Sequence, residues 1–265
     1  MAHDILNLSG QAAFVTGAGQ GAGRAIALLL AEHGAAVAVN DFVMERAERV
    51  AAEIADAGGK AAAVQADVGD LSSVRAAHAA ASETLGPVTI LVNNAGNAGP
   101  RDAITLDPEF WHTDPADWTR YFDTNLFGVM NCCHTALPAM VDARKGRVVT
   151  IVSDSARVGE PRMAAYAAAK AAAAGFSRSI AKEAGRYNVT CNAISLGSLD
   201  TLIPPDQLAA HMASERTKAQ LSRYTIRRLG TAADVAALTL FLCSDAASWI
   251  TGQTYPLNGG YSVSA

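Results

Sequence analysis

The sequence lacks any dense stretch of Lys and Arg, and its formal net charge at pH 7 is -4. Nucleic-acid binding needs a concentrated positive surface, so we expect no nucleic-acid partner. The short basic clusters at 144–147 and 223–228 are interpreted as solvated helix ends. Charged residues are few, at 17%, while half of the chain is hydrophobic, which favours a well-buried core and argues against long disordered segments.

Cysteine is also scarce, and long apolar runs are missing. The four cysteines show neither a CxxC spacing nor a disulfide framework, so we interpret them as reduced core residues and expect no metal site. The apolar run Ala25–Leu30 is far shorter than a membrane span, and Glu32 and His33 interrupt its continuation. Residues 1–7 lack the basic region and apolar stretch of a signal peptide. We therefore expect a cytoplasmic protein with no membrane partner.

Short apolar runs alternate with longer Ala-rich segments of helical period along most of the chain. This order is typical of an α/β fold in which helices cover both faces of a parallel sheet. No repeat or low-complexity linker separates a second domain, so residues 1–265 are expected to form one domain. Less regular stretches at about 97–116 and 199–228 are expected to build the substrate site. The expected strands are 12–16, 35–40, 61–65, 90–93, 147–152, 190–194 and 254–257, and the first helices are 23–33, 44–57 and 72–84.

A glycine-rich turn at 16–23, TGAGQGAG, joins the first expected strand to the first helix. Glycines let the backbone take positive φ and let a pyrophosphate approach the helix N-terminus, where unpaired N–H groups favour anions. A purely structural glycine turn is the alternative. The strand before the loop and the helix after it favour nucleotide binding.

Asp41 follows the second strand, 18 residues after Gly23, near the spacing at which a carboxylate binds the adenosine ribose. A helix N-cap is a second interpretation of Asp41, compatible with the first. An anion at this position repels a 2′-phosphate, and Gln20 in the loop is not basic. NAD is therefore favoured over NADP as the cofactor.

Tyr166 and Lys170 lie four residues apart in the strongly helix-favouring segment 163–171 and so share one helix face. A surface pair, or a core ring with a snorkelling amine, would have the same spacing. However, the helix follows a strand that ends at Ser153, 13 residues before Tyr166. The three side chains together suggest a reaction centre.

With these residues in hand, the chain resembles the compact branch of the short-chain dehydrogenase/reductase family, including 3-oxoacyl reductase and hydroxyacyl-CoA dehydrogenase-like members. The resemblance covers nearly the whole chain. It implies a Rossmann-type doubly wound sheet and an oxidoreductase that moves a hydride between NAD(H) and an alcohol or ketone carbon. The motifs that carry it are the glycine loop, Asp67-Val68, Asn93-Asn94-Ala95-Gly96, Asn125, Ser153, the Tyr166/Lys170 pair, Gly197 and Asn258-Gly259-Gly260.

The resemblance also implies a role for each site residue. Tyr166 would be the general acid/base. The Lys170 ammonium, together with the positive nicotinamide, would lower the Tyr166 pKa, and Lys170 would also bond the nicotinamide ribose. Ser153 would hold the substrate oxygen, and Asn125 would kink its helix and hold a water. The expected catalytic set is Asn125, Ser153, Tyr166 and Lys170. The expected cofactor-binding set is Gly17, Gln20, Gly21, Asp41, Asp67, Val68, Asn94, Gly96, Tyr166, Lys170, Gly197, Leu199 and Thr201.

A structural role is an alternative for Asn93 and Gly96, and the chain departs from the family's pattern before Gly197. Asn93 and Gly96 can also be read as residues that stabilise the central strand. The family usually has Pro-Gly where this chain has Leu196-Gly197, and leucine does not stiffen the turn as proline does. Gly197 and Thr201 still fit a loop that reaches the nicotinamide carboxamide.

Aromatic and basic residues in the long loops suggest features of the substrate. Trp111 is either a lid over an apolar substrate or a patch for oligomer contact. Arg157 and Arg162 either bind an anionic end, as in a hydroxyacyl thioester, or are surface charges, and Leu202, Leu208 and Met212 are a possible apolar wall. We expect a homotetramer, paired through the alanine-rich helix 163–184 and the segment 249–261. The alternatives to an NAD-dependent dehydrogenase are an NADP-dependent 3-oxoacyl reductase and a non-catalytic NAD(H)-binding protein.

Overall fold

The computed structural model describes residues 4–96 and 108–263, without the side chains of Leu202 and Pro205. Its centre is a seven-stranded sheet in the order β3-β2-β1-β4-β5-β6-β7, and every neighbouring pair is parallel. The doubly wound α/β fold expected from the sequence is thereby confirmed. The strands are β1 Ala12–Val15, β2 Ala36–Asp41, β3 Lys60–Gln65, β4 Val88–Asn93, β5 Gly146–Ser153, β6 Val189–Leu196 and β7 Thr254–Leu257. Each expected strand is present, with ends that differ by no more than two residues.

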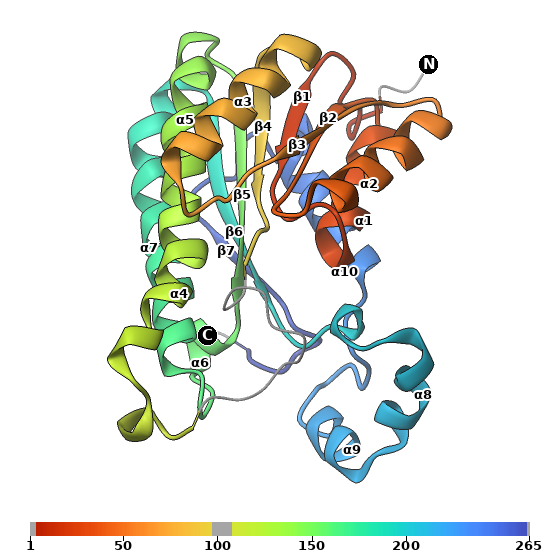
Figure 1. Ribbon diagram of the computed structural model, residues 1–265, viewed down its shortest axis with the longest axis vertical. Coiled ribbons are helices and arrows are strands. Elements are labelled where there is room, and N and C mark those ends of the chain that lie inside the picture. The colour runs from red at the N-terminus through yellow and green to blue at the C-terminus, as the bar shows by residue number, and fades with distance from the viewer. Residues whose placement is uncertain (1–3, 97–107, 264–265) are drawn as a thin grey trace.

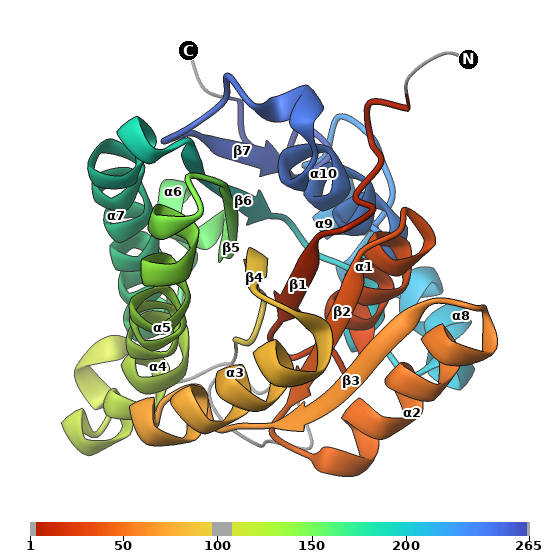
Figure 2. The same cartoon turned by 90° about the horizontal axis from the view of Figure 1, so that it is seen from above.

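Helices cover both faces of the sheet (Figures 1 and 2). One face carries α1 (Gly21–Glu32), α2 (Met44–Asp56) and α10 (Ala232–Cys243), and the other carries α3 (Leu71–Leu85), α5 (Gly128–Asp142) and α7 (Ala164–Ala184). Shorter helices are α4 Thr119–Phe122, α6 Ser155–Val158, α8 Pro205–Ala213 and α9 Glu215–Leu221. The 3₁₀ turns are η1 Phe110–His112, η2 Pro115–Asp117, η4 Gly185–Tyr187, η5 Asp200–Leu202 and η6 Asp245–Ala247, and η3, Asp123–Phe127, is a π-helical turn.

The strands are apolar on both sides because both sides face helices. Along β1, Phe14 belongs to the core under α3, α5 and α7, while its neighbours Ala13 and Val15 belong to the core under α1, α2 and α10. Leu91 and Ile90 divide between the two cores in the same way. The four cysteines are free and buried, as the sequence predicts. In the described part of the chain, no helix is both long and apolar enough to cross a membrane.

The strand order reverses between β1 and β4, and in such sheets ligands bind beyond the carboxyl ends of the strands near that reversal. At this end of the sheet lie α6, α8, α9 and the segment that follows β7 (Figure 1). The second irregular stretch expected near the substrate, 199–228, contains η5, α8 and α9. The first, 97–116, is described only from residue 108 onward, and its part at 97–107 lies outside the described residues.

Candidate active site

The glycine loop lies between β1 and α1, as the sequence predicts. Gly17 and Gly21 have positive φ, at 60° and 55°, which glycine adopts without strain. A Cβ on Gly23 would lie 2.1 Å from the Gly17 carbonyl oxygen, so only glycine allows the helix to begin this close to the loop. Gln20, the N-cap residue of α1, makes no side-chain capping bond, and the first turn of α1 holds no acidic residue. The N-terminal end of α1 therefore suits an anion such as a pyrophosphate.

Asp41 ends β2 beside this loop. Its carboxylate accepts from the Gly19 N–H and from the Val43 N–H, each at 3.0 Å, through different oxygens. Each oxygen keeps a lone pair for a further donor, so the residue fits a ribose diol while it also fixes the loop. Asp41 is not the N-cap of the next helix, because α2 begins at Met44 with Val43 as its N-cap. The Asp41 carboxylate bonds the N–H of Val43, one residue before the helix begins.

Asn94 joins the glycine loop to β4. Its side-chain amide donates to the carbonyls of Thr16 and Gly17, at 2.9 and 3.1 Å, and its own N–H bonds the Thr16 hydroxyl. Asn93, one residue earlier, is buried and donates to Thr150 and Cys133 across β4, β5 and α5. Asn93 is thus a structural residue of the central strands, and Asn94 fixes the shape of the loop on which a cofactor would lie.

The remaining nucleotide-side residues line the same edge of the sheet. Asp67 is exposed after β3 and accepts from the Gly69 N–H, and Val68 is buried. Thr201, in η5, approaches Gly21, since a Cβ on Gly21 would lie 3.8 Å from the Thr201 Cβ. Leu199 pairs with Gly230 in an isolated bridge that precedes η5.

Gly197 follows directly on β6, which continues through Leu196. The Gly197 N–H bonds the Leu257 carbonyl at 3.1 Å, and the Leu196 carbonyl accepts from the Asp154 N–H at 2.9 Å. The turn that begins at Gly197, after the leucine that stands where the family usually has proline, is therefore tied to β7.

Ser153, Tyr166 and Lys170 meet at the end of β5. Tyr166 and Lys170 lie on α7, and the Lys170 ammonium lies 6.0 Å from the centre of the Tyr166 ring. The Tyr166 ring also makes an edge contact with Tyr121, with ring centres 6.2 Å apart. Ser153 lies near enough to the Tyr166 phenol to influence its pKa, and its hydroxyl lies 2.9 Å from the Ser155 hydroxyl.

Burial shifts the pKa values of Tyr166 and Lys170. Burial raises the pKa of Tyr166, and the hydrogen bond from Ser153 opposes that rise. The expected lowering of the Tyr166 pKa by the Lys170 ammonium together with the positive nicotinamide stays a prediction. Burial also lowers the pKa of Lys170 to about 8, while its ammonium donates to the Ile151 carbonyl at 2.9 Å.

Asn125 and Gly96 complete the floor of the site. A Cβ on Gly96 would lie 2.7 Å from the Lys170 nitrogen and 2.9 Å from the Asn125 side-chain oxygen, so the three residues are in direct contact. Asn125 lies in the π-helical turn, where its amide donates to the Tyr121 carbonyl at 2.8 Å. The expected helix distortion at Asn125 is therefore this π turn.

The loops near the site modify the expectations about substrate. Trp111 is 76% exposed, and Phe110 stacks on Trp118 with ring centres 5.1 Å apart. Arg162 pairs with Glu109 at 2.6 Å. Arg157 is neither a surface charge nor a free anion binder, because its guanidinium pairs with Asp154 at 2.8 Å. Both arginines are thus engaged within the chain, which weakens the case for an anionic substrate end.

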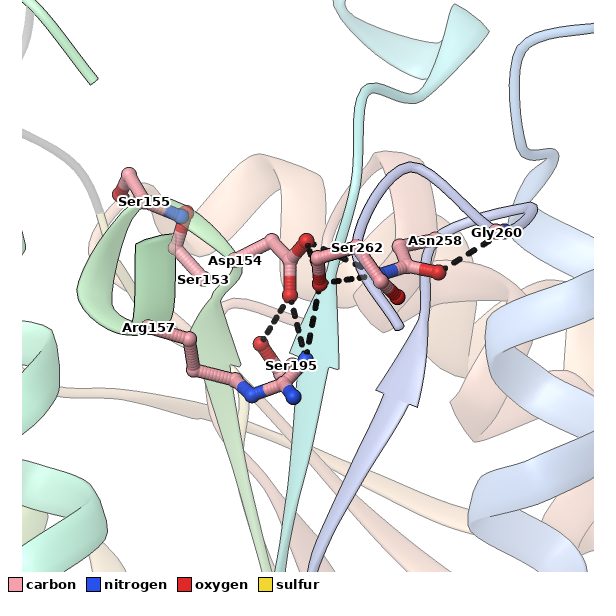
Figure 3. A network of polar contacts seen from close by, with 8 residues as sticks. All are labelled: Ser153, Asp154, Ser155, Arg157, Ser195, Asn258, Gly260 and Ser262. Carbon is pink, nitrogen blue, oxygen red and sulfur yellow. Dashed lines mark hydrogen bonds and ion pairs between the residues drawn. The ribbon is translucent and has the colours of Figure 1, made fainter. Parts of the chain in front are cut away.

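Asp154 itself was missed by the sequence reasoning. It is buried directly after Ser153 and bonds side chains from distant parts of the chain (Figure 3). The local signal was an Asp after the candidate Ser, with an Arg three residues later.

Comparisons with known proteins agree with this arrangement. The family model described as enoyl-(acyl carrier protein) reductase matches residues 17–262. The chain is 36% identical to the 7alpha-hydroxysteroid dehydrogenase of Escherichia coli (strain K12), over 97% of this chain and 96% of that protein. It is 38% identical to a 3-oxoacyl-[acyl-carrier-protein] reductase of Staphylococcus aureus, over 94% and 97%. A solved 7 alpha-hydroxysteroid dehydrogenase in complex with NADH and 7-oxo glycochenodeoxycholic acid is similar at a TM-score of 0.87 and 36% identity, over 98% of this chain and 97% of that one.

Proposed function

The chain belongs to the short-chain dehydrogenase/reductase family, a family of oxidoreductases, and we propose that it is an NAD-dependent enzyme that interconverts a secondary alcohol and its ketone. The observation that carries this proposal is the group Ser153, Tyr166 and Lys170 at the end of β5, beside a glycine loop suited to a dinucleotide. NAD(H), when bound, accepts or supplies the hydride.

In this proposal the side chains move the proton and hold the substrate. Tyr166 takes the alcohol proton on its phenolic oxygen and returns it in the reductive direction. Ser153 donates to the substrate oxygen and holds it within reach of the Tyr166 phenolic oxygen. Lys170 supplies positive charge beside the ring, and Gly96 leaves room for it. Asn125 fixes the π turn that faces them and supports the floor of the site.

The test is the oxidation of named alcohols by the purified protein, followed by NADH absorbance. Wild type should reduce NAD with at least one of glycochenodeoxycholate, 3-hydroxybutyryl-CoA and propan-2-ol. Ser153→Ala should lower kcat by about 100-fold, in the range of a lost oxyanion donor. An unchanged rate in Ser153→Ala would contradict the proposed site. Wild type that binds NADH tightly but turns over none of the alcohols would instead support the alternative, a non-catalytic NAD(H)-binding protein.

NAD is the proposed cofactor because the Asp41 carboxylate, at the end of β2 beside the glycine loop, would bind the ribose diol and repel a 2′-phosphate. Nucleotide-side contacts would come from Gly17, Gln20 and Gly21 to the pyrophosphate, with the remaining members of the expected set along the strand ends. The NAD/NADP ratio of kcat/KM should be large, and Asp41→Ser should reduce it. Because Asp41 also bonds the Gly19 and Val43 N–H groups, Ser is preferred to Ala for this test. A wild-type preference for NADP would favour the reductase alternative.

The proposed substrate carries its hydroxyl on an alicyclic or acyl skeleton. The named relatives are a hydroxysteroid dehydrogenase and a 3-oxoacyl reductase. The exposed Phe110 lies against Ala164 and Ala165, directly before Tyr166 on α7, and the exposed Trp111 follows it in the chain. Glycochenodeoxycholate or 3-hydroxybutyryl-CoA should therefore have a higher kcat/KM than propan-2-ol. A higher kcat/KM for propan-2-ol than for both larger substrates would contradict the proposed substrate class.

We further propose a cytoplasmic homotetramer. The outer face of α5 and α7 holds a hollow of about 930 Å³, in which Met130, Leu137, Phe176 and Ile180 lie beside charged residues such as Asp142, Lys182 and Glu183. Trp249, before β7, is 98% exposed and would belong to a second contact. Light scattering at micromolar concentration should give about four times the 27.4 kDa chain mass, and a monomer mass would refute it.

A further inference from the structure

Asp154 is a buried carboxylate whose hydrogen-bond partners come from four separate positions in the chain (Figure 3). The residue is only 3% exposed. One carboxylate oxygen accepts from Arg157 at 2.8 Å and from Ser195 at 3.2 Å. The other accepts from Asn258 at 2.9 Å and from Ser262 at 2.7 Å. Four donors therefore satisfy both carboxylate oxygens.

The backbone of Asp154 is held as firmly as its side chain. Its N–H bonds the Leu196 carbonyl on β6, and its carbonyl accepts from the N–H groups of Arg157 and Val158 in α6. Ser153 and Ser155 flank it on the side away from the network, and their hydroxyls lie 2.9 Å apart. A displacement of Asp154 would therefore move Ser153.

The segment after β7 is fixed in turn to the loop that follows β6. Ile226 donates to the Gly259 carbonyl at 2.8 Å. Tyr224 packs on Tyr261 with ring centres 5.1 Å apart, and its hydroxyl accepts from the Ser198 N–H at 3.1 Å. On the outer side, Tyr261 donates to Glu160 at 2.9 Å. Hydrogen bonds thus run from the turn that carries Ser153, through Asp154, to the segment after β7, and from that segment to the loop that begins at Gly197.

We propose that Asp154 is a positioning residue, whose bonds to β6 and to residues 258–262 set the place of the Ser153 hydroxyl. The proposal rests on the proposed function, in which Ser153 holds the substrate oxygen. Charge-assisted hydrogen bonds have stricter geometry than apolar packing, so they fix a turn where packing alone would leave its orientation free. Positions near a reaction centre are sensitive to this, since about 1 Å of misplacement can lower a rate by about 100-fold.

The central variant is Asp154→Asn, which keeps the size of the side chain but replaces one acceptor with a donor that faces Asn258 and Ser262. We expect kcat to fall by about 10- to 100-fold, with NADH affinity measured by fluorescence unchanged within about twofold. The matched control is Asp245→Asn. It removes a carboxylate that pairs at 3.0 Å with the buried Arg147, at the opposite end of β5, and it should leave kcat unchanged.

A double-mutant cycle separates positioning from general destabilisation. If Asp154 acts through Ser153, the Asp154→Asn change should lower kcat by less than about twofold in a Ser153→Ala background. An equal loss in both backgrounds would overturn the proposal. A large loss in Ser153→Ala with no loss in Asp154→Asn would overturn it while the proposed function stands. An active Ser153→Ala enzyme would contradict the proposed function itself.

A second readout needs no substrate. Hydrogen exchange in the peptide that contains residues 153–160 should speed up by about tenfold or more in Asp154→Asn, because the turn loses its ties. Asp245→Asn should leave that peptide unchanged. Equal exchange in wild type and Asp154→Asn would overturn the proposal. Ser195→Ala, which removes one donor and keeps Arg157, Asn258 and Ser262, should give the same changes at smaller size if Asp154→Asn does not fold.

Discussion

Replacing Lys170 with Met should make the cofactor-free protein more stable near neutral pH. Lys170 is 3% exposed, and burial lowers its pKa from 10.5 to about 8. Methionine has nearly the same length and no charge to desolvate. The protein therefore holds a cation that folding disfavours, which is expected if the charge serves a reaction rather than the fold.

The size and pH range of the effect follow from the two pKa values. Below pH 8 both the folded and the unfolded chain carry the proton, and the folded chain bears the full cost of the buried charge. Between about 8 and 10.5 the unfolded chain binds more protons than the folded chain, so the free energy of unfolding rises with pH. The total rise is roughly 3 kcal/mol, of which roughly 2 kcal/mol is reached by pH 9.5.

Lys170→Met should remove this pH dependence. The variant loses the hydrogen bond to the Ile151 carbonyl, which costs about 1 kcal/mol, so it should be roughly 2 kcal/mol more stable than wild type at pH 7. The difference should be close to zero at pH 9.5. Urea unfolding of both proteins at pH 7, 8.5 and 9.5, at one protein concentration, measures it. A constant difference across this range, or a variant that is less stable at pH 7, would refute the reasoning.

Three further outcomes are expected. Tyr166→Phe should lower kcat by at least about 100-fold and leave NADH affinity unchanged in a fluorescence titration, and retention of more than a few per cent of kcat would exclude Tyr166 as the acid/base. Gly23→Ala, whose Cβ would lie 2.1 Å from the Gly17 oxygen, should lower the free energy of unfolding by about 1–3 kcal/mol, whereas Gly185→Ala, with open space around it, should change it by less than about 1 kcal/mol in urea titrations. Trp111→Ala should raise KM for glycochenodeoxycholate by about tenfold and leave KM for propan-2-ol unchanged if Trp111 covers the substrate, and equal KM values in both enzymes would end that idea.

The fold could be predicted because its signals are local. Each strand is a short apolar run and each long helix is rich in alanine, so the alternation alone gives the layers. The ends were less certain: β6 runs two residues beyond its expected end, to Leu196, since its pairing with β7 continues to Leu257.

Some features of the candidate site could be predicted from sequence spacing, and others depend on contacts that only the fold creates. Tyr166 and Lys170 are four apart on one helix, and Ser153 ends the strand before it, so sequence spacing was enough to bring them together. Asp41 was assigned two roles, and its second proved to be a bond to the glycine loop 22 residues earlier rather than a helix cap. The direction of the Tyr166 pKa depends on burial, which spacing does not show.

Arg157 shows where the sequence reasoning ends. Its partner, Asp154, is three residues away, but the reason that this pair is buried lies with Asn258 and Ser262, which are 104 and 108 residues from Asp154. No local pattern connects positions that far apart. The sequence therefore left two interpretations of Arg157, a contact to an anionic substrate end or a surface charge, and the buried ion pair with Asp154 is neither of them.

Because residues 258–262 lie about 100 residues after Asp154 in the chain, they are synthesised much later, and this affects the sequence in which parts of the protein can fold. Strands β1 to β4 and helices α1 to α3 come from the first 93 residues, so the nucleotide half of the sheet can begin to form early. The turn that carries Ser153 leaves the ribosome next, but it gains half of its carboxylate bonds only after about 100 more residues have followed. A nascent chain would thus be able to assemble its nucleotide loop well before its reaction centre is held in shape, and catalysis would be the last property that it acquires.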